Sequence, residues 1–207
     1  MPLTAVFADD HLVVLDKPAG LLSVPGRGAD KQDCLASRAQ AQWPDALVVH
    51  RLDMATSGLL LLARGAAMQR LLSDAFAQRR VHKRYIAVVQ GLLAADQGSI
   101  DAPLAADWPN RPRQQVDTVR GKASLTHWTV LSRDSALQRT WLELEPVTGR
   151  SHQLRVHLAS IGHAIVGDTL YGAGAAAAPR LLLHASRLGF DHPHTGRPLQ
   201  LHSPAPF

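Results

Sequence analysis

The chain has 207 residues, of which 46% are hydrophobic, so it is long and apolar enough to bury one sizeable core, and we expect a single domain over residues 1–207. Its formal net charge of +5 at pH 7 favours a polyanionic partner such as nucleic acid. The single cysteine, Cys34, excludes an intrachain disulfide, and the lack of any apolar run approaching roughly 18 residues excludes a membrane helix, so we expect a cytoplasmic protein.

The order of apolar runs and turn residues predicts an α+β fold. In chain order, the predicted elements are strands 6–7 and 12–15 as a hairpin, a loop through Gly28, a helix over about 33–42, strands 47–49 and 59–62, an amphipathic helix 66–79, strand 85–89, strands 125–131 and 140–144 with a turn at 132–135, a helix from about 151, and a flexible connection at 172–178. Because the strands come in hairpins and the helices are irregularly spaced, we expect a mixed, largely antiparallel central sheet with flanking helices.

The segment HRLDMATSGLLLLA, residues 50–63, is the most informative stretch of the chain. It places Asp53 after a β-rich run and before a turn and an apolar strand, so the carboxylate is predicted at the end of a strand, where ligands often bind. Taken alone, Arg51 and Asp53 are equally consistent with an ordinary surface ion pair.

The same segment resembles the catalytic motif of the RluA family of RNA pseudouridine synthases, whose nucleophilic aspartate falls at Asp53. Four other blocks resemble, in order, the family's opening segment and its second, third and fourth motifs. These blocks are DHLVVLDKPAGL at 10–21, KRYIA at 83–87, GRSHQLRVHL at 149–158 and LLLHA at 181–185. They occur in the family's order and span nearly the whole chain.

The resemblance implies a cofactor-independent isomerase that moves uracil from an N-glycosidic to a C-glycosidic bond. It implies the α+β pseudouridine synthase catalytic fold. Because no sequence precedes the first predicted strand, we expect no N-terminal S4-type RNA-binding domain, and RNA affinity is expected to come from the catalytic domain. Asp53 is expected to attack the base or the ribose C1′, or to stabilise a detached base, and the sequence does not choose among these roles.

Two further residues are implied to be catalytic by their places in the matched motifs. Arg155 corresponds to an arginine that pairs with the catalytic carboxylate and keeps it ionised; a phosphate-binding arginine is the less favoured alternative. Tyr85 corresponds to a tyrosine that stacks on the target base and helps to remove its proton, although a strand tyrosine is usually structural.

The remaining site residues are expected to bind RNA. Arg51 is implied to contact RNA around the space left by the flipped uridine, and Leu154 to line the base pocket. Arg150 lies in a basic cluster within the third motif, and the Pro-rich basic loop 106–116 carries Trp108, Arg111 and Arg113, side chains suited to stacking and to phosphate contacts.

The loop 106–116 and the segment 23–27 resemble a dual-specificity branch of the family. Its members modify a hairpin-loop uridine in 23S rRNA and the first anticodon-loop uridine of certain tRNAs. We therefore expect structured RNA of both kinds as partners of a monomeric protein. Two features depart from the pattern: Asp16 stands where the family more often has Asn, and the stretch to Ala178 is rich in alanine. They weaken the inference of this chain's substrates from the resemblance.

Alternative functions fit the sequence less well. His152, His157 and His163 lack metal-ligand spacing, so no metal site is predicted. Glu143 and Glu145, the only glutamates, fall on one strand face, and a glycosidase would need one of them to face Asp53 across a sugar. A synthase restricted to one RNA and a noncatalytic RNA-binding protein remain as rivals.

Overall fold

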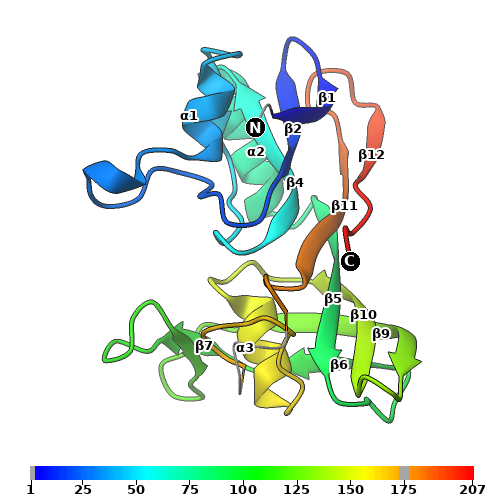
Figure 1. Ribbon diagram of the computed structural model, residues 1–207. Helices are drawn as coiled ribbons and strands as arrows, with labels where there is room; N and C mark the ends of the chain where they lie inside the picture. The colour runs from blue at the N-terminus through cyan, green and yellow to red at the C-terminus, as the bar shows by residue number, and fades with distance from the viewer. Residues whose placement is uncertain (1–2, 173–177) are drawn as a thin grey trace. The chain divides into compact units, whose positions relative to one another are not determined.

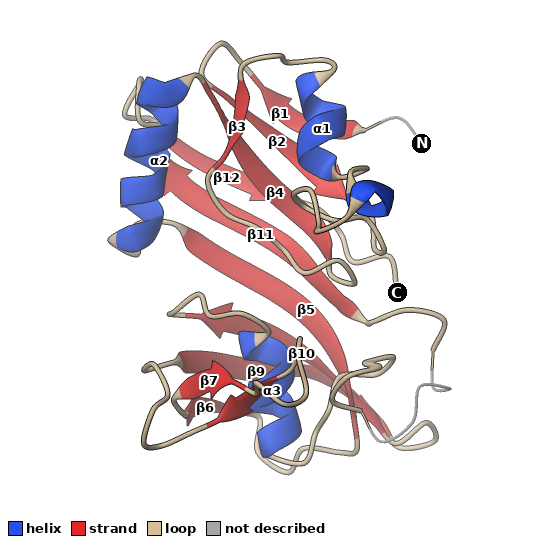
Figure 2. Ribbon diagram, turned by 90° about the vertical axis from the view of Figure 1, so that its left-hand side faces the viewer, coloured by secondary structure: helices blue, strands red, loops and turns tan. Residues whose placement is uncertain are grey.

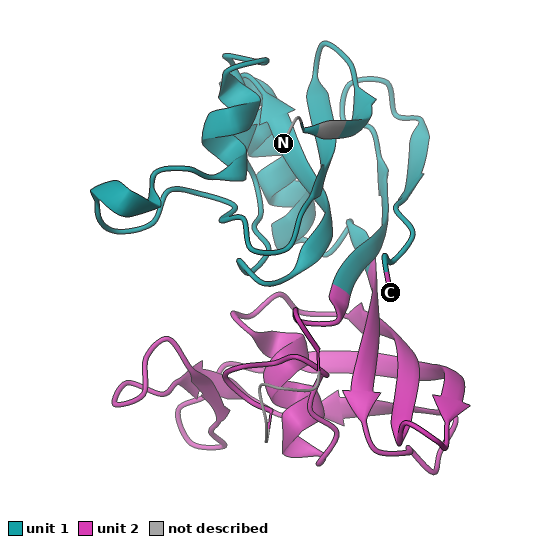
Figure 3. Cartoon of the chain, viewed as in Figure 1, with its two compact units in different colours: residues 1–83, 184–206 teal, residues 84–183, 207 magenta. Residues whose placement is uncertain are grey.

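The computed structural model describes residues 3–172 and 178–207 of the chain. It contains two compact units: unit 1 comprises residues 1–83 and 184–206, and unit 2 comprises residues 84–183 and Phe207 (Figure 3). Most of the predicted connection 172–178 lies outside the described residues. The expectation that the whole chain acts as one catalytic domain concerns activity and stays a prediction.

Unit 1 is a sheet with two α-helices. Its elements are β1 (Thr4–Ala8), β2 (Leu12–Lys17), a 3-10 helix at Ala29–Lys31, α1 (Leu35–Gln40), β3 (Ala46–Val48), β4 (Ser57–Arg64), α2 (Ala66–Ala77), β11 (Leu183–Asp191) and β12 (Pro198–His202). Strand β2 is antiparallel to both β1 and β4, whereas β11 is parallel to β4. Both α-helices lie on the face of this sheet that is turned toward the viewer in Figure 2.

The core of unit 1 forms where α2 covers the middle of this sheet. Alternate residues of the central strands, such as Leu12 on β2 and Leu59 on β4, join Met68, Leu72 and Ala75 of the helix in one buried cluster. The spacing of three or four on the helix is what the sequence predicted. The strand residues of the cluster are two apart because successive side chains of a strand point to opposite faces. The run 59–62 is buried on both faces of the sheet, which explains why β4 is continuously apolar.

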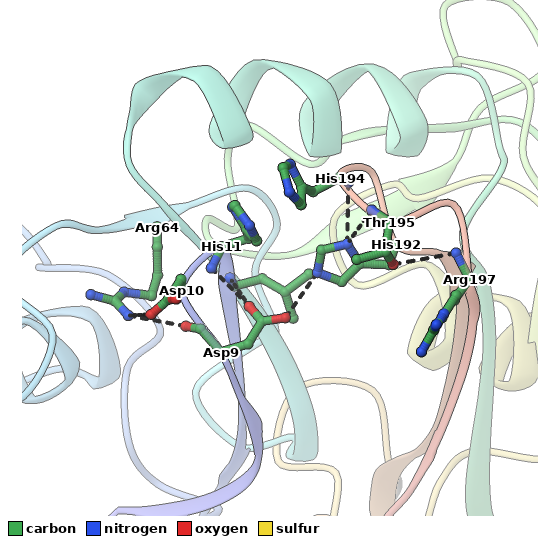
Figure 4. Close-up of polar contacts among 9 residues, drawn as sticks. Asp9, Asp10, His11, Arg64, His192, His194, Thr195 and Arg197 are labelled. Carbon is green, nitrogen blue, oxygen red and sulfur yellow. Dashed lines mark hydrogen bonds and ion pairs between the residues drawn. The ribbon is translucent and has the colours of Figure 1, made fainter.

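The turns at one end of unit 1 are joined by a histidine (Figure 4). His192, which follows β11, bonds through Nε2 to a carboxylate oxygen of Asp9, 2.9 Å away, and its Nδ1 accepts the backbone N–H groups of His194 and Thr195. Burial of Asp9 acts to raise the pKa of its carboxyl, but hydrogen bonds from the backbone N–H groups of His11 and Leu12 and the contact with His192 outweigh it and lower that pKa. The β11–β12 turn is thereby fixed to the N-terminal hairpin.

Unit 2 contains four antiparallel strands, a two-stranded hairpin and a buried helix. Its elements are β5 (His82–Gln90), which begins in unit 1, β6 (Gln97–Asp101), β7 (Leu104–Ala106), β8 (Gln114–Val116), β9 (Leu125–Asp134), β10 (Arg139–Pro146) and α3 (Gln153–Ser160). Strands β5, β10, β9 and β6 are antiparallel neighbours in that order, and β7 and β8 form a separate hairpin. Helix α3 lies beside the larger sheet (Figure 1).

The α+β class and the mixed, largely antiparallel sheet are confirmed, but two sequence expectations are corrected. The turn between β9 and β10 lies at 135–138 instead of 132–135, because residues 132–134 continue β9 and pair with residues 139–141 of β10. Strands β6, β7, β8, β11 and β12 were not predicted; all of them except β11 are short and only partly apolar. Among the described residues, no helix is long and apolar enough to cross a membrane.

Candidate functional site

Asp53 lies in the loop 49–56 that connects β3 to β4 in unit 1. Its carbonyl oxygen accepts the backbone N–H of Thr56 at 3.1 Å, so a tight turn separates the carboxylate from the start of β4. Asp53 therefore lies inside the loop, four residues before β4 begins, and not at the end of a strand as the sequence predicted. Arg51, two residues earlier on the same loop, is exposed, as a side chain that contacts RNA must be.

The peptide groups on both sides of Asp53 are held by side chains that sequence reasoning did not single out. The hydroxyl of Ser23 donates to the carbonyl oxygen of Leu52 at 2.7 Å and accepts its N–H at 3.1 Å. The ammonium group of Lys17 donates to the carbonyl oxygen of Met54 at 3.1 Å. These bonds fix the backbone that carries the carboxylate, which is the arrangement a reactive side chain needs.

Lys17 is fully buried, and a buried cation is costly unless polar groups surround it. Besides Met54, its ammonium group donates to the carbonyl oxygens of Pro18 and Leu21, at 2.9 and 2.8 Å. Lys17 therefore ties the opening block 10–21 to the Asp53 loop, and the N–H of Gly20 adds a second bond to the carbonyl oxygen of Met54 at 2.8 Å.

His50 anchors the beginning of the loop. Its Nε2 accepts the backbone N–H of Leu61 at 2.9 Å, and its ring stacks on Phe76 at a centroid distance of 4.5 Å. Desolvation, aided by the charge of Lys83, lowers the pKa of His50 to about 3. The ring is therefore neutral at pH 7 and has a structural role.

The fourth motif, residues 181–185, supports the start of β4 within unit 1. His184 bonds through Nδ1 to the hydroxyl of Ser57 at 2.8 Å and through Nε2 to the hydroxyl of Ser203 at 3.0 Å. Ser203 in turn donates to a carboxylate oxygen of Asp16 at 2.6 Å. The departure from the family's usual Asn at this position thus keeps an acceptor, and Asp16 belongs to a buried structural network.

Gly58 shows why the motif needs glycine after Ser57. Its φ is +110°, and a Cβ atom there would lie 2.3 Å from the carbonyl oxygen of Ala185 on β11. Only glycine combines this conformation with such a close approach of two strands.

In unit 2, Arg155 forms a buried, two-pronged ion pair with Asp168. Its Nε and Nη2 atoms donate to the two carboxylate oxygens at 2.8 and 2.7 Å, and both residues are at most 5% exposed. Burial alone would raise the pKa of Asp168, but the hydrogen bonds and charge of Arg155 and the N–H groups of Leu170 and Tyr171 lower it. Asp168 was not predicted, and the expected pairing of Arg155 with Asp53, a residue of unit 1, stays a prediction.

Tyr85 and Leu154 also belong to unit 2. Tyr85 lies on β5, opposite Leu144 of β10, and is half-buried; Leu154 is buried at the start of α3. Arg150 is exposed just before that helix. Its backbone N–H donates to the side-chain oxygen of Gln153 at 3.0 Å, and its Nε donates weakly to the carbonyl oxygen of Ala123. Their roles toward a base and a phosphate remain predictions.

The basic loop forms an ordered hairpin, which we call the arginine hairpin and define as residues 104–116. Its tip is closed by Asp107, whose N–H donates to the carbonyl oxygen of Arg113 at 3.0 Å. The guanidinium of Arg111 lies over the ring of Trp108, 3.3 Å from its centroid, and that ring is 66% exposed. Arg113 lies 5.4 Å from the ring centroid of Tyr171. The hairpin therefore presents cations and an aromatic face to solvent in a fixed arrangement.

The side chains considered for metal binding or sugar hydrolysis are engaged elsewhere. Nδ1 of His152 bonds to Tyr171, Nδ1 of His157 to Thr126, and Nδ1 of His163 to the carbonyl oxygen of Gln90. The part of the chain that the structure describes holds no group of three His, Cys, Asp or Glu side chains suited to a metal ion. The two glutamates share a strand face, as predicted. There Glu143 and Glu145 both pair with Arg84.

Comparisons with known proteins point to one family. A family model described as RNA pseudouridylate synthase matches residues 11–160. The dual-specificity RNA pseudouridine synthase RluA of Yersinia pestis is 46% identical over 207 residues, covering 99% of this chain and 100% of that protein. The protein of the same name from Escherichia coli strain K12 is 44% identical, covering 99% of this chain and 94% of the relative.

Solved structures agree with the sequence relatives. The structure of human RNA Pseudouridylate Synthase Domain Containing 1 superimposes with a TM-score of 0.83 at 27% identity, covering 99% of this chain and 84% of that chain. Human RNA Pseudouridylate Synthase Domain Containing 4 gives a TM-score of 0.77 at 26% identity, covering 98% and 88% of the two chains.

Proposed function

The chain belongs to the RNA pseudouridylate synthase family, and we propose that it modifies two RNAs: a hairpin-loop uridine of 23S rRNA and the first uridine of the anticodon loop of certain tRNAs. The enzyme class is established by the family: the protein is an RNA pseudouridine synthase, an isomerase that converts uridine to pseudouridine in RNA. The family resemblance inferred from the segment 50–63 and four further sequence blocks is thereby confirmed. The observation that carries the dual specificity is 44–46% identity to synthases of that name over nearly the full chain.

The reaction breaks the bond between N1 of uracil and C1′ of ribose and forms a bond between C5 and C1′. The proton on C5 leaves and N1 gains one, so no oxidant or external group is consumed. We propose that Asp53 supplies the anionic side chain for this exchange, and the clamped backbone of its loop supports that role because a fixed nucleophile loses little entropy on the way to the transition state.

We assign Tyr85 to stacking and proton removal and Arg155 to charge pairing with the catalytic carboxylate. The burial of Arg155 supports a role in orientation over one in phosphate binding, because phosphates are reached from the surface. Leu154, which precedes Arg155 in the sequence and is also buried, is assigned to the base pocket.

Binding of the RNA is assigned to the exposed side chains. The arginine hairpin supports this assignment, because its stacked Trp108–Arg111 pair offers an aromatic face and cations that suit unpaired bases and phosphates. Arg51 and Arg150 add exposed cations. Two RNAs that present a similarly bent loop can satisfy the same contacts, so dual specificity needs no separate binding module. We further propose that the whole chain acts as one monomeric catalytic domain in the cytoplasm, where both RNAs are used.

The test uses two RNA hairpins, an anticodon stem-loop and the corresponding 23S rRNA stem-loop, each labelled with tritium at C5 of uridine. Isomerisation releases the label, because the new bond replaces the C5–H bond. We expect release from both RNAs with the wild-type protein and from neither with Asp53→Asn. Release from one RNA alone would favour the single-substrate alternative.

A further inference from the structure

Tyr171 joins three segments of unit 2 that the sequence treats separately. Its hydroxyl oxygen accepts the backbone N–H of Gln114, the first residue of β8, at 2.7 Å. The same oxygen lies 2.7 Å from Nδ1 of His152, at the start of α3. Because the hydroxyl accepts from Gln114, its own proton remains available to donate to His152. One hydroxyl thus connects the arginine hairpin to the third motif.

The ring of Tyr171 makes a second connection between the same segments. The guanidinium carbons of Arg113 and Arg155 lie 5.4 and 5.2 Å from its centroid, within the range of cation–π attraction. The backbone N–H of Tyr171 donates to Asp168 at 3.1 Å, the carboxylate that pairs with Arg155. A residue of the RNA-binding hairpin and the buried arginine therefore share one aromatic neighbour.

We propose that Tyr171 is a positioning residue for uridine isomerisation: its hydroxyl holds the arginine hairpin next to its tip for RNA, and its ring supports the side chain of Arg155. This inference rests on the proposed function and adds a residue to it. The two parts of the side chain then have separate effects, since the hydroxyl acts through the hairpin on RNA binding and the ring acts through Arg155 on turnover.

Two substitutions separate the hydroxyl from the ring. Tyr171→Phe keeps the ring and removes both hydroxyl bonds, so KM for the RNA is expected to rise about five- to tenfold, in line with the loss of one or two hydrogen bonds, while kcat stays near the wild-type value. Tyr171→Leu also removes the aromatic face from Arg113 and Arg155, so kcat is expected to fall as well.

A matched control is available in the same unit. The hydroxyl of Thr140 donates to the carbonyl oxygen of Gly91 at 2.9 Å and accepts the N–H of Leu93 at 3.2 Å, so it also joins two backbone segments. Thr140→Val removes that hydroxyl without touching the hairpin. It is expected to lower the melting temperature as Tyr171→Phe does, but to leave KM unchanged.

A double-mutant cycle tests whether the hydroxyl acts through the hairpin. KM and kcat are measured on the stem-loop that the wild-type enzyme modifies, and the dissociation constant for the same RNA is measured without turnover. Tyr171→Phe is expected to have little effect in an Arg113→Ala background, both on KM and on the dissociation constant. A wild-type KM for Tyr171→Phe, or effects of the two changes that simply multiply, would overturn the proposal.

The outcomes distinguish this proposal from the proposed function. If the wild-type enzyme modifies neither stem-loop, the substrate assignment fails, and the cycle on dissociation constants still decides the role of Tyr171. If the wild-type enzyme is active and Tyr171→Phe matches the Thr140→Val control in KM, only the role of Tyr171 fails.

Discussion

Removal of the negative charge at Asp168 is the most demanding test of the ion pair in unit 2. Asp168→Asn keeps the size of the side chain but places an amide beside the buried guanidinium of Arg155, whose two donors now lie 2.7 and 2.8 Å from the carboxylate oxygens. Breaking a buried ion pair by removing one of its members costs about 3–5 kcal/mol. We expect the free energy of unfolding to fall by about that amount, since Arg155 keeps its charge at any accessible pH.

The matched control is the pair of Asp33 and Arg38. It has the same two-pronged geometry, with both distances at 2.6 Å, but its side chains are 63% and 33% exposed. Solvent screens such a pair, so Asp33→Asn is expected to change stability far less. Urea denaturation of both variants measures the difference, with an unchanged m value showing that the folded state is intact.

The pH dependence gives the same test a second readout. Because the pKa of Asp168 is lowered in the folded protein, its contribution to stability is present above the pKa of the unfolded chain and is lost as pH falls through the folded value. Asp168→Asn should remove this acid-side loss. If Asp168→Asn costs no more than Asp33→Asn and leaves the acid profile unchanged, the buried pair does not contribute as argued.

Four further predictions follow from the described contacts. Asp53→Asn should abolish tritium release while RNA affinity stays largely intact, because only the anionic group is lost; release near the wild-type rate would remove Asp53 from the mechanism. Arg111→Ala with Arg113→Ala should weaken RNA binding and lower the log-log salt slope by roughly 0.7 to 0.9 for each lost phosphate contact, and an unchanged slope would refute the phosphate role of the hairpin. The pKa of His50 is lowered to about 3, so below the ordinary histidine value of 6.5 the unfolded chain binds a proton that the folded chain does not, and the free energy of unfolding should fall as pH drops from 6.5 to about 3. His50→Gln, which keeps an acceptor for Leu61, should flatten this dependence of stability on pH. Equal slopes for the two proteins in urea titrations would contradict the assignment. Linear versions of the two stem-loop RNAs should react much more slowly than the folded forms, and equal rates would exclude recognition of loop shape.

The elements predicted from the sequence are those whose own side chains drive their formation. The strands β2 and β4 and the helix α2 bury residues at the spacing of their secondary structure, so local pattern and tertiary burial agree. Strands β6, β7 and β8 were not predicted, because their stability comes from pairing with other strands, and the sequence of one segment does not show its partner.

The candidate site divides in the same way. Asp53, Arg155 and the other motif residues were named from the sequence because each stands inside a contiguous block that resembles a family motif. Lys17 lies inside such a block, but its role became visible only when its ammonium group was found among carbonyl oxygens that include that of Met54. A hydrogen bond between residues 37 positions apart leaves no trace in local composition.

Asp168 and Tyr171 were decided by tertiary structure alone. In the sequence, the run Gly167-Asp168-Thr169-Leu170-Tyr171-Gly172 reads as turn chemistry, since Gly and Asp are common in turns. The fold brings the carboxylate of Asp168 onto Arg155, thirteen positions earlier, and the hydroxyl of Tyr171 onto Gln114 and His152. The chain by itself determined the chemistry available at each position, whereas the partners were chosen by packing, because a buried charge or hydroxyl is stable only where the fold supplies its counterpart.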